Sequence, residues 1–200
     1  MNLKPNRIIG DFKEGSLTLE AWKNFQSRQG RYASKDSNNK SNGKVKIFVE
    51  GCEIDYVKVS SHAQVAVIKF LVDNSELIRD EILKELLAFL PDRKSTFDID
   101  LPNINFATDF KNFIGLSIVH VLTSEKDDFA YVGFEFGCTW DEEHGLGVMT
   151  HKDRIIAIGQ ADKAFDTWVT YSDNGTAALI SEKWGIDDKD VKSPWWKFWN

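Results

Sequence analysis

The chain has 200 residues, of which 42% are hydrophobic and 28% charged, and its formal net charge at pH 7 is −6. This length fits one domain that buries a substantial core without disulfides or metals to stabilise it. The negative charge disfavours nucleic acid as a partner and favours a basic protein. The N-terminus lacks the apolar stretch of a signal peptide and no segment is apolar enough to span a membrane, so we expect a cytoplasmic protein.

The first 44 residues are expected to hold one strand and a short helix or turn between two irregular stretches. Residues 1–11 are predicted to be a flexible leader, followed by a single domain over residues 12–192. Apolar residues alternate from Leu17 and cluster up to Phe25, which predicts a strand leading into a short helix or turn. The polar residues 26–44 are expected to be a surface loop or a disordered segment.

A hairpin is predicted next. Residues 45–49 are rich in β-branched and aromatic side chains, and residues 54–59 alternate between apolar and polar. The two segments flank Glu50-Gly51, a sequence that is typical of a turn. We therefore expect the two strands to pair with each other.

Two helices follow the hairpin. Ser61 is expected to cap the first, because Gln64 lies three residues later, at the spacing of a capping box. This helix is apolar nearly all round and is expected to be buried. Residues 73–75 mark a break, after which an amphipathic helix is predicted to end at Pro91.

The C-terminal half contains clear strand signals, and strands are expected over residues 116–123, 129–139, 146–151 and 154–158. A two-residue loop, Lys152-Asp153, places His151 opposite Arg154. Together these elements predict an α+β fold, in which an antiparallel β-sheet, made of the C-terminal meander and the hairpin, packs against two helices.

Alternation along residues 129–139 separates two faces of the sheet. Cys138 shares one face with Ala130, Val132, Phe134 and Phe136, so it is predicted to be a core residue. Glu135 lies on the other face between two glycines, where the backbone of a partner could approach. His120 alternates with Leu116, Ile118 and Leu122 and is expected to be a sheet histidine with its hydrogen bonds satisfied.

The segment richest in candidate functional residues is Gly133-Phe-Glu-Phe-Gly-Cys-Thr-Trp-Asp-Glu-Glu-His-Gly-Leu-Gly-Val-Met-Thr-His151. Its acidic loop, residues 141–144, is flanked by glycines that permit unusual backbone conformations. With the later Gly159-Gln-Ala-Asp162, the segment resembles a family of bacterial domains of unknown function that carry the signature FGCxWDEEHGLGVxxHxDR. The resemblance implies kinship with immunity-type proteins of toxin systems.

Three interpretations compete for the loop residues Asp141, Glu142, Glu143, His144 and the downstream His151. A metal site is disfavoured because the two histidines are separated by a strand, and acid–base catalysis lacks a nucleophile or cofactor motif beside it. In the third, Asp141 caps a turn and the loop is a solvated rim that can bind a protein. We predict no metal, no cofactor and no catalytic residue.

The tail, residues 193–200, holds four aromatic residues and is expected either to fold back over a groove or to dock on a partner. We expect a protein-binding domain, most concretely an immunity-type protein that neutralises a cytoplasmic bacterial toxin with a basic surface. The alternatives are a hydrolase-type enzyme using residues 135–151, and a scaffold acting through the tail. The predicted contact residues are Glu135, Asp141, Glu142, Glu143, His144, His151, Trp195, Trp196 and Trp199.

Overall fold

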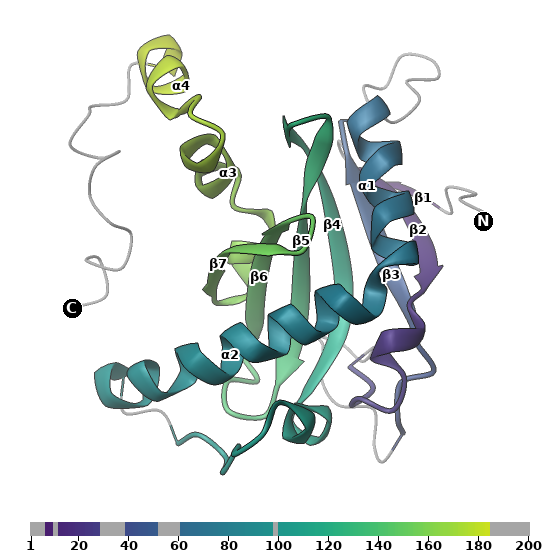
Figure 1. Ribbon diagram of the computed structural model, residues 1–200, viewed down its shortest axis with the longest axis vertical. Coiled ribbons are helices and arrows are strands. Elements are labelled where there is room, and N and C mark those ends of the chain that lie inside the picture. The colour runs from purple at the N-terminus through teal and green to yellow at the C-terminus, as the bar shows by residue number, and fades with distance from the viewer. Residues whose placement is uncertain (1–6, 10–11, 29–38, 52–60, 98–99, 185–200) are drawn as a thin grey trace.

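A seven-stranded sheet forms the centre of the protein in a computed structural model that describes residues 7–9, 12–28, 39–51, 61–97 and 100–184 (Figure 1). The strands lie in chain order from β1 to β7. All neighbours are antiparallel except β3 and β4, which are parallel. The α+β prediction is confirmed. The strands are β1 (Arg7–Ile9), β2 (Phe12–Thr18), β3 (Lys44–Glu50), β4 (Ile114–Lys126), β5 (Phe129–Cys138), β6 (Leu146–His151) and β7 (Arg154–Gly159).

The N-terminal strands extend the sheet beyond the predicted meander. Residues 7–9, which lie in the segment expected to be a leader, pair with β2. The strand predicted from Leu17 begins earlier, at Phe12, and leads into the 3-10 helix η1 (Glu20–Trp22). The predicted order of strand and short helix is therefore confirmed.

The strands beside β3 in the sheet are not those that the predicted hairpin requires. It pairs with β2 on one side and, over Lys46–Val49, with Ile118–Val121 of β4 on the other. Both edges of β3 are occupied there, so the expected pairing with residues 54–59, which lie outside the described residues, has no free edge in this stretch. Parallel neighbours need a long crossover connection, and the two long helices supply it.

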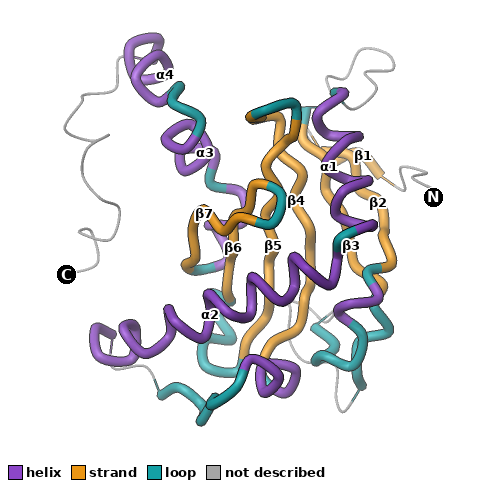
Figure 2. The backbone as a smooth tube through the Cα atoms, viewed as in Figure 1, coloured by secondary structure: helices purple, strands orange, loops and turns teal. Residues whose placement is uncertain are grey.

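Both long helices cross the same face of the sheet (Figure 2). They are α1 (His62–Asp73) and α2 (Ser75–Phe97). The capping box at Ser61 is confirmed, because the Ser61 side chain accepts from the Gln64 N–H and the Gln64 side chain accepts from the Ser61 N–H. α1 is not buried all round, since Val65 is exposed. None of the described helices is long and apolar enough to cross a membrane.

The prediction that Pro91 ends the second helix is wrong, because α2 continues to Phe97. Proline removes one backbone hydrogen bond and strains the preceding turn, but the residues after it can resume helical geometry. The break between the two helices lies where it was expected, with α1 ending at Asp73 and α2 beginning at Ser75. The helical turn predicted near residue 109 is the 3-10 helix η3 (Ala107–Asn112).

The main core lies between these helices and the sheet face that carries Phe134 and Phe136. Trp22 of η1 packs against it, with its ring centroid 5.1 Å from that of Phe136. Cys138 is fully buried in this core, as predicted. Burial raises the pKa of its thiol to about 12, so the group is neutral and unreactive at physiological pH.

The second face of the sheet, which carries His120, Tyr131 and Glu135, is covered in part by later elements. These are the 3-10 helix η4 (Ala161–Phe165) and α3 (Thr167–Asp173), and α4 (Ala177–Trp184) follows and packs against α3. A β-bulge between Leu116 and Ile118 reverses the alternation of β4. Leu116 therefore faces the main core and not the face of His120, which corrects the regular alternation assumed from the sequence.

Candidate functional site

The acidic loop between β5 and β6 is a turn fixed by its own hydrogen bonds. One oxygen of Asp141, Oδ1, accepts from the His144 backbone N–H at 3.0 Å and lies 3.0 Å from Nδ1 of the same histidine. Gly145 donates its N–H to the Asp141 carbonyl and has a φ of 67°, in the left-handed region that favours glycine. Asp141 thus caps the turn, as the sequence predicts.

The loop is also held from two sides. The Cys138 thiol donates to the Asp141 carbonyl at 3.4 Å, and Trp140 packs against the main core. On the other side, the Ala161 N–H donates to the His144 carbonyl at 3.2 Å, which joins the loop to the start of η4. The position of the loop backbone is therefore set by the core and by η4 together.

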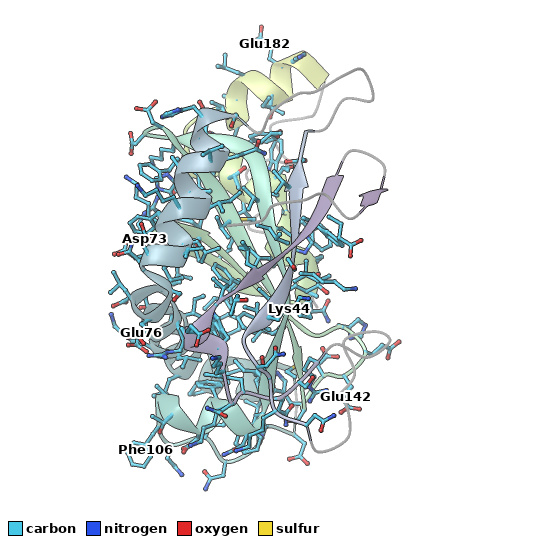
Figure 3. All side chains as sticks on the ribbon, turned by 90° about the vertical axis from the view of Figure 1, so that its right-hand side faces the viewer. Lys44, Asp73, Glu76, Phe106, Glu142 and Glu182 are labelled. Carbon is cyan, nitrogen blue, oxygen red and sulfur yellow. The ribbon has the colours of Figure 1, made fainter. Side chains whose placement is uncertain are left out.

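One carboxylate of the loop lies near a buried cation. The Glu142 side chain, which is labelled in Figure 3, is 69% exposed, and its Oε1 is 3.6 Å from Nη1 of Arg28, whose side chain is 1% exposed. Gln26 Oε1 accepts from the same guanidinium at 2.8 and 2.6 Å. Glu143 is exposed, and Asp141 is mostly covered by its capping role. Sequence reasoning missed Arg28, which lies in the polar stretch that we expected to be a loop.

Glu135 lies away from this loop, on the second face of the sheet. Its Oε2 is 2.9 Å from Nε2 of the buried His120. The His120 ring lies between those of Phe48 and Phe165, at centroid distances of 5.7 and 5.1 Å. The other ring nitrogen, Nδ1, is buried without a hydrogen-bond partner. The expectation that His120 is a satisfied sheet histidine therefore holds for one nitrogen alone.

The glycines beside Glu135 allow the backbone of another segment of the same chain to pack closely against the sheet. A Cβ on Gly133 would lie 1.5 Å from the carbonyl oxygen of Ala164, and one on Gly147 would lie 2.4 Å from that of Gln160. The backbone of η4 thus rests directly on the sheet where the sequence suggested that a partner could approach. The Gly159-Gln-Ala-Asp162 segment leads from β7 into η4, and a Cβ on Gly159 would lie 2.6 Å from Cγ of Lys163.

His151 is far along β6 from the acidic loop, at the opposite end of that strand. It faces Arg154 across the turn, as predicted, and its Nε2 lies 2.8 Å from the carbonyl oxygen of Lys126. Its ring packs 5.0 Å from that of Tyr131. The structure thus gives His151 a packing role, and Trp195, Trp196 and Trp199 lie outside the described residues.

The residues named for an enzyme are not brought to one place. Glu135 pairs with His120, Asp141 pairs with His144, and His151 contacts a backbone carbonyl elsewhere. In the part of the chain that the structure describes, no group of three or more His, Cys, Asp or Glu side chains could hold a metal ion. The acidic loop and the Glu135–His120 pair are therefore two separate candidate sites, linked by η4.

The family model whose description is "Domain of unknown function (DUF6985)" matches residues 13–165. The chain belongs to this family. The match begins in β2 and ends at Phe165, the last residue of η4, so it contains both candidate sites and stops before α3. No match was found among the curated proteins or among the solved structures.

Proposed function

We propose that this chain is a protein-binding domain of the immunity type, which acts in the cytoplasm and neutralises a toxin by binding a basic surface on it. The contact is the acidic loop, residues 141–144. The observation that supports this is a turn held by hydrogen bonds from Cys138, Gly145 and Ala161, from which the exposed Glu142 and Glu143 project.

A turn that is ordered before binding loses little conformational entropy when a partner docks on it. Exposed carboxylates at such a contact attract a basic partner over a distance and raise the association rate. The net charge of −6 adds to this field. The loop therefore combines the two properties that favour fast and specific capture of a basic protein.

Most of the surrounding motif has a structural role, which leaves the two glutamates as the part open to a partner. Phe136 and Cys138 are core residues, Asp141 caps the turn, and Gly145 and Gly147 allow close backbone contacts. Glu142 pairs with Arg28 but keeps most of its side chain in solvent, and Glu143 is exposed. An exposed acidic pair above a stiff turn fits a recognition role.

The test neutralises the pair without altering the turn. The variant Glu142→Gln/Glu143→Gln keeps the size of both side chains and leaves Asp141 in place. A matched control, Asp73→Asn/Glu76→Gln, removes the same charge at exposed positions on the helical side of the molecule, away from Glu142 (Figure 3). The binding assay uses a candidate basic partner, first the protein encoded by a neighbouring gene.

We expect the loop variant to associate several-fold more slowly than the unaltered chain at low salt, and the two rates to converge at high salt. The control should stay within about twofold of the unaltered chain, because the charges it removes lie far from the contact. Equal rates for the two variants, or failure of the unaltered chain to bind any basic protein, would contradict the proposal.

A further inference from the structure

One of the two carboxylate oxygens of Glu135 has a hydrogen-bond partner, and the other does not, among the described residues. His120 occupies Oε2, whereas Oε1 has no hydrogen-bond partner among the described residues, and the side chain is 19% exposed. A proton on the buried Nδ1 of His120 would be a donor without an acceptor, so the imidazole is best assigned as carrying its proton on Nε2 and donating it to Glu135. Oε1 of Glu135 then remains available to another donor.

The neighbours of Glu135 along its own strand and on β6 are glycines, which have no side chain. Gly133 and Gly137 flank it on β5, and Gly147 is its partner on β6. On β4 its partner is the apolar Ile118. A partly buried carboxylate with one unpaired oxygen can accept a charge-assisted hydrogen bond at that oxygen.

Two cations near this face of the sheet are engaged with other groups. Lys163 of η4 lies 2.5 Å from Asp166. Arg28 approaches the same face at Gly115 and is held by Gln26 and Glu142. These two ion pairs involve Asp166 and Glu142, and the contact of Glu135 with His120 uses Oε2, which leaves Oε1 to accept from a cation of a partner.

An exposed aromatic ring completes the arrangement. Phe165, at the end of η4, is 45% exposed, and its ring lies against His120, the residue that holds Glu135. A planar guanidinium can stack on an aromatic ring while it donates to a carboxylate, and it is more weakly hydrated than an ammonium group. A carboxylate and a ring that contact one imidazole offer both interactions together.

We propose that Glu135 and Phe165 form a seat for an arginine side chain of the basic partner, with His120 as the residue that positions the carboxylate. The proposal rests on the proposed function, because η4 joins this arginine seat to the acidic loop through the contact between Ala161 and His144. A basic segment that lies along η4 would meet the loop at one end and the seat at the other.

The probe is the peptide Gly-Arg-Gly with acetylated and amidated ends, with Gly-Lys-Gly as its counterpart, titrated into the full chain. Binding is followed by the NMR shifts of the backbone amides of Gly133 and Gly147. Glu135→Gln keeps the shape of the side chain and an acceptor for His120, and it should weaken arginine-peptide binding by about tenfold. Phe165→Ala should weaken it by about threefold.

The loop variant Glu142→Gln/Glu143→Gln separates the two proposals. It should bind the arginine peptide within twofold of the unaltered chain, because the seat does not include the loop. No saturable shift in the unaltered chain, unchanged binding in Glu135→Gln, or equal binding of the lysine peptide would overturn the arginine seat. None of these results bears on the association rates that test the acidic loop.

Discussion

Asp173 joins α3 to the sheet, and its replacement by asparagine tests how the C-terminal helices are held. Its carboxylate accepts from the Tyr131 hydroxyl at 2.7 Å and from two nitrogens of Arg154, each at 2.7 Å. Lys126 approaches the same carboxylate at 3.3 Å. The Asp173 side chain is 16% exposed, whereas that of Arg154 is half exposed.

The expected loss in the free energy of unfolding is about 2 kcal/mol for Asp173→Asn. Most of it comes from Tyr131, which is fully buried and would lose the charged acceptor of its hydroxyl, at a cost of roughly 1–3 kcal/mol. The ion pair with the half-exposed Arg154 is screened by solvent and contributes at most about 1 kcal/mol. The asparagine oxygen can still accept one hydrogen bond, so the two contributions do not simply add.

The same contact predicts how stability depends on pH. The hydrogen bond from Arg154 is the largest cause that holds the pKa of the Asp173 carboxyl well below its usual value, and burial opposes it. Because the folded-state pKa is lowered, the stabilisation is present in full above the unfolded-state value of about 4 and is lost as the pH falls below it. The difference in the free energy of unfolding between the unaltered chain and Asp173→Asn should therefore decrease as the pH is lowered from 5.

Urea unfolding of the two chains at pH 7 and at several values below pH 5 measures both effects. Asp73→Asn is the control, because Asp73 is exposed at the end of α1, and it should change stability by no more than about 0.5 kcal/mol. If Asp173→Asn is as stable as that control at pH 7, or if the difference persists unchanged in acid, the assigned role of Asp173 is wrong.

Two further predictions concern the buried parts of the candidate site. In a Cys52→Ser background, Cys138 should not react with a thiol reagent until the chain is unfolded in denaturant, and rapid reaction of the native protein would contradict its place in the core. Gly133→Ala should cost about 3 kcal/mol or more in urea unfolding, or prevent folding, because its Cβ would overlap the Ala164 carbonyl. Gly175→Ala, with open space around the new Cβ but a φ of 80°, should cost about 1 kcal/mol, and equal losses would refute the close contact of η4.

Local patterns in the sequence were sufficient for much of the fold. The period-2 pattern of residues 129–138 placed Cys138 in the core, and the spacing of Ser61 and Gln64 located the start of α1. The two-residue turn set His151 opposite Arg154. These features depend on residues close together in the chain, so their spacing determines them directly. The acidic residues of the loop were recognised as one group because they are consecutive in the chain.

The tertiary structure alone decided which distant residues meet. The parallel pairing of β3 with β4 and the bulge after Leu116 depend on the whole sheet, and no local pattern shows them. Arg28 lies beside Glu142 because segments more than a hundred residues apart in the chain pack together. The alternation assumed for β4 from the sequence did not reveal that His120 pairs with Glu135 beside Phe165, because that arrangement requires η4 to lie on glycines of two strands. Contacts of this kind form through burial and backbone fit over long separations, and single-sequence periodicity does not contain that information.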